Sequence, residues 1–535
     1  MLTPKDTIKQ TRDAFTWDIP ERYNIGVDIC DKTADKTPDA LALIDVGPDG
    51  TAKHYSFGQL KTLSNQLANL LAQSTQKGDR VGVLLPQSLH TAIAHIAVLK
   101  LGAIFLPLFT LFGPDALLHR LRDAGATTLI TTRREAAKIE AIRTDLPDLK
   151  TILTTDDLTA QLPEQSAEFT PADTSAEDPA ILIYTSGTTG PPKGALHAHR
   201  VLLGHLPGVE ISHDFFPQPG DRIWTPADWA WIGGLLDVLM PALHHGVPVV
   251  ACRFEKFTAE AAFALMAQHQ IRNAFLPPTA LKMMRQATQT PAKGVQLRSV
   301  ASGGETLGAS LIDWGQTVLG TTINEFYGQT ECNMIVSSCA ALTPAEPGVM
   351  GFPVPGHAVA VIDPETGETC KTGQDGQIAV RHPDPVMFLR YWNNPQATAR
   401  KFVTSPDGTW LLTGDEGQLT PLGRIKFLAR DDDVITSAGY RIGPGEVEDC
   451  LLTHPAVSLA GVVGAPDKTR GAIVAAFVVL AKGHAPSTAL KDEIAQHVKT
   501  RLAAHEYPRR ITFLSELPMT TTGKIIRAKL RERLV

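Results

Sequence analysis

Residues 184–194, YTSGTTGPPKG, combine the residue types that can hold a polyphosphate. An apolar run, Ala180–Ile183, precedes them, as is typical of a buried strand that opens into a tight loop. Glycines let backbone N–H groups approach an anion closely, hydroxyls add donors, and a lysine adds charge. A polar surface linker is the alternative. The candidate loop residues are Thr185, Ser186, Gly187, Thr188, Thr189, Gly190 and Lys193.

The spacing of this stretch excludes the common phosphate-binding loop G-x-x-x-x-G-K-[ST]. Its lysine lies beyond the second glycine, with two prolines between them. A second stretch, EFYGQTE at 325–331, places the hydroxyl of Thr330 beside the carboxylate of Glu331. Such a carboxylate can hold Mg²⁺, which takes oxygen ligands and shares them with phosphates. Taken alone, these residues could also be a polar strand end.

Alternating strands and helices are predicted to position these stretches. Residues 80–86 indicate a buried strand ended by proline, residues 89–101 a helix, and residues 102–107 the next strand. This order favours parallel sheet with helices packed on it. From about residue 345, short apolar runs such as 376–380 and 423–427 indicate a smaller antiparallel or barrel-like part. The aspartates at 431–433 are expected to be solvated, so we place a domain boundary there.

The composition is that of a globular protein with more than one domain. The chain has 535 residues, of which 43% are hydrophobic and 20% charged. A net charge of −6 gives no reason to expect nucleic acid or a membrane surface as partner. The first residues have no apolar core, so no signal peptide is expected, and residues 471–481 suit a buried strand better than a membrane span. Six cysteines without a CxxC pair predict a reducing, cytoplasmic compartment and no structural zinc.

The YTSGTTGPPKG string resembles the signature of the AMP-forming adenylating enzymes, a superfamily that includes acyl-CoA synthetases, peptide-synthetase adenylation domains and firefly-type luciferases. Further stretches resemble its motifs in family order: SGGE at 302–305, EFYGQTE at 325–331, WLLTGD at 410–415, GYRIGP at 439–444 and PMTTTGKIIR at 518–527. The resemblance covers essentially the whole chain and is strongest to short/medium-chain and acetyl-type acyl-CoA synthetases. It implies an α/β fold with two domains. Residues 1–431 would form a large domain of packed, parallel-rich sheets with a small β-barrel part, and residues 432–535 a small mobile α+β lid, with the hinge at Asp432.

The resemblance implies catalytic roles for three residues and a metal-binding role for a fourth. Lys524 would reach both the substrate carboxylate and the α-phosphate, since an ammonium is a compact charge. Thr330 would contact the α-phosphate, and Arg441 would bind phosphate through its fork of donors. Glu331 would hold Mg²⁺.

The nucleotide and CoA sites are implied in the same way. Tyr327 would face the adenine and Asp415 would accept hydrogen bonds from the ribose hydroxyls. Arg430 would add a ribose or phosphate contact, and Gly439 would let the pantetheine arm of CoA pass close to backbone. The other implied nucleotide-binding positions are Gly303, Gly304, Glu305 and Gly328.

The implied reaction has two steps and uses ATP, Mg²⁺ and CoA. A carboxylate attacks the α-phosphate of ATP to give an acyl-adenylate and pyrophosphate, and the CoA thiol then releases AMP and acyl-CoA. The nucleophile is already an anion, so the protein mainly positions groups and neutralises charge. In the family the lid rotates between the steps, and we expect Asp432 to be the pivot.

The acyl pocket is expected near Trp231, Gly233 and Gly328. Acetate-specific relatives have a tryptophan at the position of Gly328, so a glycine there predicts a deeper pocket. Of the three tryptophans at 224, 229 and 231, two are expected to be core residues. The substrate is predicted to be an uncharged short-to-medium-chain acid, branched and aromatic acids included. Pocket selectivity is only about 1–3 kcal/mol per methylene, so the preference should be broad.

Two other functions stay open. The enzyme could load a separate carrier protein instead of CoA, or the fold could be a nucleotide-binding regulator without catalysis. The intact Lys524, Glu331, Asp415 and Arg441 argue against the second. Expected partners are the small-molecule acid, ATP and CoA, without nucleic acid or membrane, together with a homodimer partner and a lysine acetyltransferase that would remove the charge of Lys524.

Overall fold

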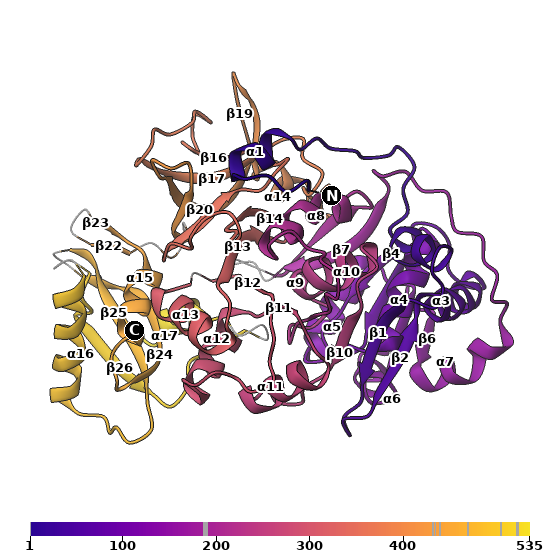
Figure 1. The fold of residues 1–535 in the computed structure, drawn as a ribbon, viewed down its shortest axis with the longest axis horizontal. Helices are drawn as coiled ribbons and strands as arrows, with labels where there is room; N and C mark the ends of the chain where they lie inside the picture. The colour runs from indigo at the N-terminus through magenta and orange to yellow at the C-terminus, as the bar shows by residue number, and fades with distance from the viewer. Residues whose placement is uncertain are drawn as a thin grey trace.

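The computed structural model describes residues 2–185, 191–305, 307–430, 433, 435–437, 440–467, 470–502, 506–520 and 524–534, with the side chains of residues 436, 440 and 441 outside that description. Within these ranges the strands form sheets of fourteen, seven and five strands. The two larger sheets and their helices form the body of the molecule, and the five-stranded sheet lies at one end of it (Figure 1). The expected α/β fold with a large N-terminal part and a small C-terminal part is confirmed.

The seven-stranded sheet has the order β18-β8-β7-β4-β3-β5-β6. The strand, helix and strand expected from residue 80 onward are β3 (Arg80–Leu84), α4 (Leu89–Lys100) and β4 (Ile104–Pro107), and β3 pairs with β4 in parallel. Ser88 caps α4 by accepting a hydrogen bond from the backbone N–H of Thr91. Nearly all of α4 is buried, because its apolar residues contact neighbours on every side. The other strands of this sheet are β5 (Thr128–Thr131), β6 (Thr151–Thr154), β7 (Pro179–Thr185), β8 (Lys193–Ala198) and β18 (Arg390–Tyr391).

The fourteen-stranded sheet joins parallel and antiparallel parts in one structure. β12 (Ser299–Gly303) and β13 (Ile323–Gln329) pair in parallel, whereas β14 (Cys332–Ser337) returns antiparallel to β13. β15 (Val349–Pro353) then pairs with β14 and with β21 (Ile425–Arg430). The expected barrel-like part is therefore an antiparallel extension of the large sheet. Its further strands are β1 (Leu41–Val46), β2 (Ala52–Ser56), β9 (Ile223–Trp224), β10 (Val249–Cys252), β11 (Asn273–Phe275), β16 (Val359–Ile362), β17 (Asp375–Arg381), β19 (Phe402–Ser405) and β20 (Gly408–Leu419).

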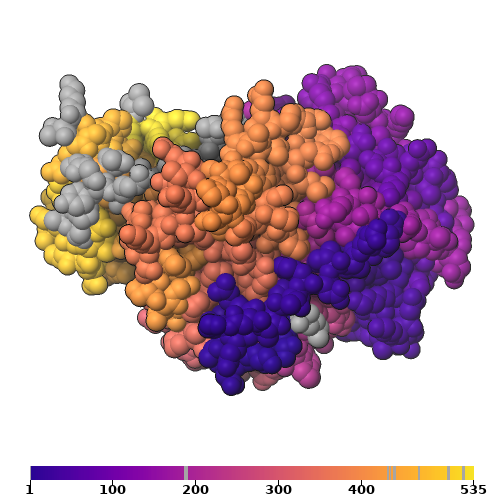
Figure 2. Space-filling model, turned by 90° about the horizontal axis from the view of Figure 1, so that it is seen from above, coloured from indigo at the N-terminus to yellow at the C-terminus, as the bar shows by residue number. Residues whose placement is uncertain are grey.

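Helices cover the sheets of the body, and the N-terminal segment runs over its surface. Figure 2 shows this segment, in indigo, against the antiparallel extension, where Trp17 Nε1 donates to the carbonyl of Gly356 at 2.9 Å. In the part of the chain that the structure describes, no helix has the length and apolar character needed to cross a bilayer. The other α-helices of the body are α1 (Ile8–Asp13), α2 (Lys32–Ala34), α3 (Phe57–Ala72), α5 (Pro114–Ala124), α6 (Arg133–Glu140), α7 (Thr155–Gln161), α8 (Val201–Ser212), α9 (Ile232–Gly234), α10 (Met240–His244), α11 (Ala259–Gln268), α12 (Pro278–Ala287), α13 (Ala309–Trp314) and α14 (Pro395–Ala399).

The described residues between 435 and 534 form a unit that we call the terminal lobe. Its sheet has the order β23-β22-β25-β24, with β26 paired to β25. The strand expected at residues 471–481 is β25, and it is the centre of two apolar clusters that lie within the lobe. The elements of the lobe are β22 (Ile435–Ser437), β23 (Tyr440–Ile442), α15 (Pro444–Leu452), β24 (Val457–Asp467), β25 (Gly471–Leu480), α16 (Thr488–Arg501), β26 (Arg510–Leu514) and α17 (Arg527–Glu532).

Candidate active site

The candidate phosphate loop connects two paired strands. β7 ends at Thr185 and β8 begins at Lys193, and these two residues are register partners. The loop residues Ser186, Gly187, Thr188, Thr189 and Gly190 lie outside the described residues. Lys193 Nζ lies 4.9 Å from the centroid of the Tyr391 ring, a cation–π contact. The predicted lysine is thus positioned at the mouth of the loop by an aromatic ring.

Tyr391 also contacts Glu331, the residue expected to hold Mg²⁺. Its hydroxyl donates a hydrogen bond to Glu331 Oε1, and both side chains are buried. Burial, followed by the negative charge of Glu331, raises the pKa of the Tyr391 hydroxyl, which therefore stays protonated as a donor. Tyr391 could not be predicted from the sequence, because a single tyrosine on the two-residue strand β18 carries no local signal of a role.

The residues around Glu331 fit Mg²⁺. A carboxylate at the β13–β14 turn, next to the half-buried hydroxyl residue Thr330, supplies the hard oxygen atoms that this ion prefers. Lys193, which contacts the ring of the same Tyr391, would add a positive charge for the phosphates. Glu331 would hold the ion, which when bound neutralises charge on the polyphosphate.

A second group of residues suits the nucleoside. Tyr327 Oη donates a hydrogen bond to Asp415 Oδ2 at 2.6 Å. Asp415 on β20 is the register partner of Arg430 on β21, and Arg430 Nε lies 3.8 Å from Asp415 Oδ1. Burial raises the pKa of Asp415, and the charge of Arg430 opposes that shift. Three residues that the sequence predicted for adenine, ribose and phosphate therefore form one connected group.

Lys524 reaches this region from the terminal lobe. A Cβ built on Gly304, whose φ is +101°, would lie 3.3 Å from Lys524 Cε, and Lys524 Nζ lies 5.9 Å from the centroid of the Trp231 ring. Burial lowers the pKa of Lys524, whereas the charges of Glu305 and Asp415 raise it. Gly304 combines a left-handed backbone with this close approach, so a glycine is required there.

Packing explains the glycine at position 303, which precedes Gly304. A Cβ on Gly303 would lie 2.6 Å from the ring of Phe326. That ring belongs to an aromatic row in which Phe326 lies 5.3 Å from Phe275, and Phe275 lies 5.8 Å from Trp231, between ring centroids. The GGE stretch therefore passes between the aromatic row and the lysine of the terminal lobe.

Comparison with known proteins agrees with this arrangement. The model of the AMP-binding enzyme family matches residues 30–392, and that of the AMP-binding enzyme C-terminal domain matches residues 446–524. The chain belongs to the AMP-binding enzyme family. This AMP-binding enzyme is 33% identical to the human mitochondrial acyl-coenzyme A synthetase ACSM4 over 539 residues, which cover 96% of this chain and 91% of that protein.

Solved structures support the same assignment. The acyl-CoA synthetase of Brucella canis is 32% identical, with a TM-score of 0.74 and 99% of each chain covered. The anthranilate CoA ligase AuaEII, solved with anthranoyl-AMP, is 29% identical, with a TM-score of 0.86, 97% of this chain and 98% of that chain covered. These matches confirm, at the level of the family, that the protein is an acyl-CoA synthetase. Such an enzyme is an AMP-forming acid–thiol ligase that uses ATP, Mg²⁺ and CoA.

Two glycines of the expected acyl pocket of this AMP-binding enzyme pack closely against their neighbours. A Cβ on Gly328 would lie 2.5 Å from the backbone N of Met334, where β13 and β14 shift register, so this backbone leaves no room for a side chain at position 328. A Cβ on Gly233 would lie 2.9 Å from the rings of Trp231 and Phe275, so these rings pack directly against the glycine. The extra pocket depth expected at Gly328 stays a prediction.

Trp231 itself lines a cavity of about 280 Å³. Trp224 and Trp229 are fully buried, so the expectation that two of the three tryptophans are core residues is confirmed. The other apolar residues of the cavity wall include Phe109, Leu111, Phe254, Phe257, Ala280 and Met283. Gly439, Asp432 and the side chain of Arg441 lie outside the described residues, so their expected roles remain predictions.

Proposed function

We propose that this enzyme activates an uncharged carboxylic acid longer than acetate, of short to medium chain length, and transfers it to CoA. The proposal depends on the position of Trp231. Lys524 Nζ lies 5.9 Å from the centroid of the Trp231 ring, and Trp231 also lines the cavity of about 280 Å³, whose wall combines apolar side chains with Asp228, Arg253 and Glu255. A cation for the carboxylate and a partly apolar space for the acyl tail therefore meet at Trp231. Branched and aromatic acids belong to this class, as the anthranoyl-AMP of the similar solved structure illustrates.

The side chains of the site suit the first step, in which the acid is activated. The carboxylate nucleophile needs no general base, so Lys524 would act by neutralising charge between the carboxylate and the α-phosphate. Lys193 and Thr330 would hold phosphate oxygens, and Asp415 would hold the ribose. Because the terminal lobe carries Lys524, its position controls whether the first step can occur.

We infer that residues 1–431 and 432–535 are two domains and that the second rotates about Asp432 between the steps. The five-stranded sheet begins at Ile435, three residues after this position, and its apolar clusters are separate from those of the body. Asp432→Pro should leave pyrophosphate release largely intact and block thioester formation, because proline fixes the φ angle that a pivot must change. Equal loss of both half-reactions would contradict the pivot.

The decisive experiment measures pyrophosphate release with ATP, Mg²⁺ and a panel of acids, with and without CoA. The panel runs from acetate to decanoate and includes branched acids and benzoate. Maximal CoA-dependent turnover with an acid longer than acetate is the expected result. Pyrophosphate release without CoA turnover would instead favour a carrier protein as acceptor, and a maximum at acetate would overturn the proposed acid class.

Three further predictions concern the location, the oligomeric state and the modification of the enzyme. From the sequence we expect a cytoplasmic location, a homodimer, and acetylation of Lys524 by a lysine acetyltransferase. Cell fractionation, sedimentation and mass spectrometry of the purified protein test them in that order. Acetylation should abolish the first half-reaction, because it removes the charge of Lys524.

A further inference from the structure

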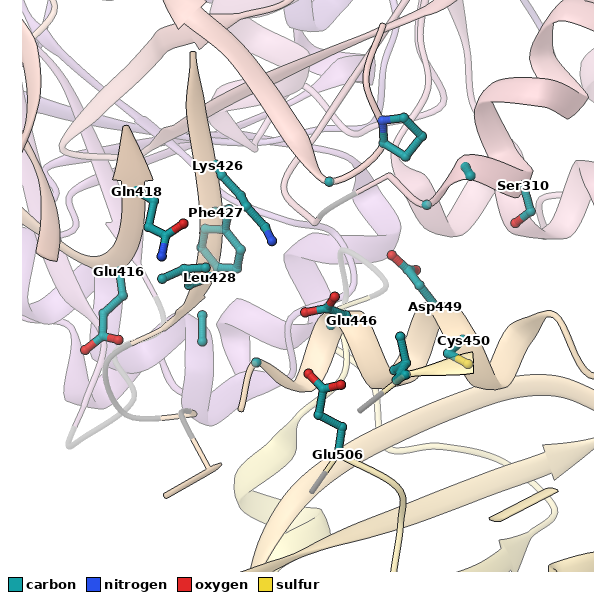
Figure 3. Close-up of a pocket in the computed structure, with 18 of the residues that line it drawn as sticks. Ser310, Glu416, Gln418, Lys426, Phe427, Leu428, Glu446, Asp449, Cys450 and Glu506 are labelled. Atoms are coloured by element: carbon teal, nitrogen blue, oxygen red, sulfur yellow. The ribbon is translucent and has the colours of Figure 1, made fainter. Parts of the chain in front are cut away.

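The terminal lobe is attached to the body by polar contacts. Among the described residues, no buried apolar cluster joins the lobe to the body. A cavity of about 440 Å³ separates the two over part of their boundary, lined by α13, β20 and β21 on one side and by α15 on the other. Figure 3 shows Glu446 and Asp449 projecting from α15 toward this cavity, opposite Lys426 on β21. Without a shared apolar core, the polar contacts beside the cavity determine how the lobe docks.

Two side chains of one helix of the body, α12, make hydrogen bonds to the lobe. Gln286 Nε2 donates to the backbone carbonyl of Ser458 at 2.8 Å and to its hydroxyl at 3.1 Å. Arg285 makes a longer contact of 3.5 Å with the carbonyl of Leu452, the last residue of α15. A carbonyl at a helix C-terminus has no partner within its helix, so a guanidinium is well placed to bind it.

Lys282 adds charge to the same helix surface. Its Nζ lies 3.1 Å from Glu305 Oε2, next to Gly304, and the charge of Asp449 in the lobe attracts it as well. Burial lowers the pKa of Lys282, but the charges of Glu305 and Asp449 outweigh that effect and raise it. The ion pair of Lys282 with Glu305 therefore supports the GGE stretch of the body, which Lys524 of the lobe approaches at Gly304.

We propose that α12 is a docking helix, in which Lys282, Arg285 and Gln286 hold the terminal lobe where Lys524 meets Gly304 and Trp231. The proposal rests on the proposed function, because it assigns these side chains to the acid-activating half-reaction. They are positioning residues that act through Lys524. Loss of the Gln286 contacts frees the lobe from this pose without changing any group expected to touch ATP or the acid, whereas loss of Lys282 also removes the ion pair of Glu305, an expected nucleotide-binding residue.

The test compares the two half-reactions in Gln286→Ala and Lys282→Ala. Acid-dependent ATP–pyrophosphate exchange reports the first, and CoA-dependent consumption of a synthetic acyl-adenylate reports the second. We expect kcat for exchange to fall about three- to tenfold in both variants, since each removes one or two hydrogen bonds or an ion pair, with little change in the KM for ATP in Gln286→Ala. The second half-reaction should be unchanged or faster. Gln268→Ala, an exposed glutamine at the end of α11, is the matched control and should change neither.

Two additional variants separate positioning from a merely structural role. Lys282→Arg keeps the charge and should recover most of the exchange rate. In a Lys524→Ala background, Gln286→Ala should cause no further loss of exchange, because both changes act through one side chain. An equal fall in both half-reactions, or a full additional loss in the Lys524→Ala background, would overturn the proposal.

Hydrogen exchange tests docking without any acid substrate. In Gln286→Ala, backbone amides of α12 and of the segment around Ser458 should exchange faster than in the unaltered enzyme, while β3 and β4 should be unchanged. Unchanged exchange at α12 and Ser458 would overturn the docking role. If the unaltered enzyme activates no acid at all, the proposed function fails, and this measurement still decides whether α12 holds the lobe.

Discussion

Tyr391 donates a hydrogen bond through its hydroxyl to the Glu331 carboxylate, while the face of its ring contacts the ammonium of Lys193. One side chain thereby orients both groups expected to act on the polyphosphate and its metal. Tyr391→Phe keeps the ring contact and removes the hydrogen bond to a buried carboxylate, a loss of about 1–3 kcal/mol. We expect the Mg²⁺ concentration for half-maximal ATP binding, measured by calorimetry, to rise about tenfold.

Tyr23→Phe is the matched control for this prediction. The Tyr23 hydroxyl donates to Asp28 Oδ2 at 2.8 Å, a similar tyrosine–carboxylate pair in another part of the body. Its loss should lower stability without changing the Mg²⁺ requirement. The same Mg²⁺ requirement in the Tyr391→Phe variant and the unaltered enzyme would show that Tyr391 only supports the fold.

Asp415 is expected to recognise the ribose. Its carboxylate accepts from Tyr327 and lies against Arg430, so replacement by asparagine removes a charged acceptor from a connected group. Asp415→Asn should reduce kcat/KM for ATP about 10- to 100-fold, because a hydrogen bond to a charged group contributes about 1.5–3 kcal/mol. With 2′,3′-dideoxy-ATP the loss should be much smaller. Asp407→Asn, in an exposed turn, is the control, and an equal loss with both nucleotides would assign Asp415 a structural role only.

The acid-activating step should lose rate at alkaline pH. Lys524 neutralises charge only as the ammonium, which is the form present below its pKa. Burial lowers that pKa below the ordinary lysine value of 10.5, so the rate is full at low pH and falls as the pH rises through the lowered value. Lys524→Arg should lose most of the rate but also this alkaline fall, because a guanidinium stays protonated. A pH profile of ATP–pyrophosphate exchange measures both, and an identical fall in the two proteins would assign it to another group.

Glu325 is expected to make stability depend on pH. Burial, opposed by a backbone hydrogen bond from Leu307, raises its pKa to about 8, and the negative charge of Asp449 adds to the rise. The folded state therefore binds more protons than the unfolded state between about pH 4.5 and pH 8, so stability falls as the pH rises through that window.

Glu325→Gln removes this effect. Relative to the unaltered protein, the variant should gain stability as the pH increases, with a difference on the order of 4 kcal/mol between pH 5 and pH 8.5 at about 1.4 kcal/mol per pKa unit. Denaturant unfolding at the two pH values measures the difference. Glu365→Gln, at an exposed turn, is the control. A constant difference between variant and unaltered protein across the window would contradict the assignment.

The sequence by itself was sufficient for features that depend on neighbouring residues. The alternation of apolar runs with helical periodicity predicted β3, α4, β4 and their parallel pairing. Glycine-, hydroxyl- and lysine-rich strings predicted the loops of the site, because those residue types are needed wherever backbone approaches phosphate or a nucleoside. Family resemblance then connected strings that are far apart in the chain, including Lys524 near the C-terminus.

Only the tertiary structure decided which of these residues meet and what lies between them. The contacts of Tyr391 with Glu331 and of α12 with the terminal lobe join segments 60 or more residues apart, and such pairs leave no local pattern. Gly328 makes the same point for space: the sequence shows only its residue type, whereas the structure shows that the backbone of β14 lies where a side chain would be. Sequence specifies which atoms are present, whereas the direction of each Cα–Cβ bond, and so the shape of a pocket, follows from the packing of the whole fold.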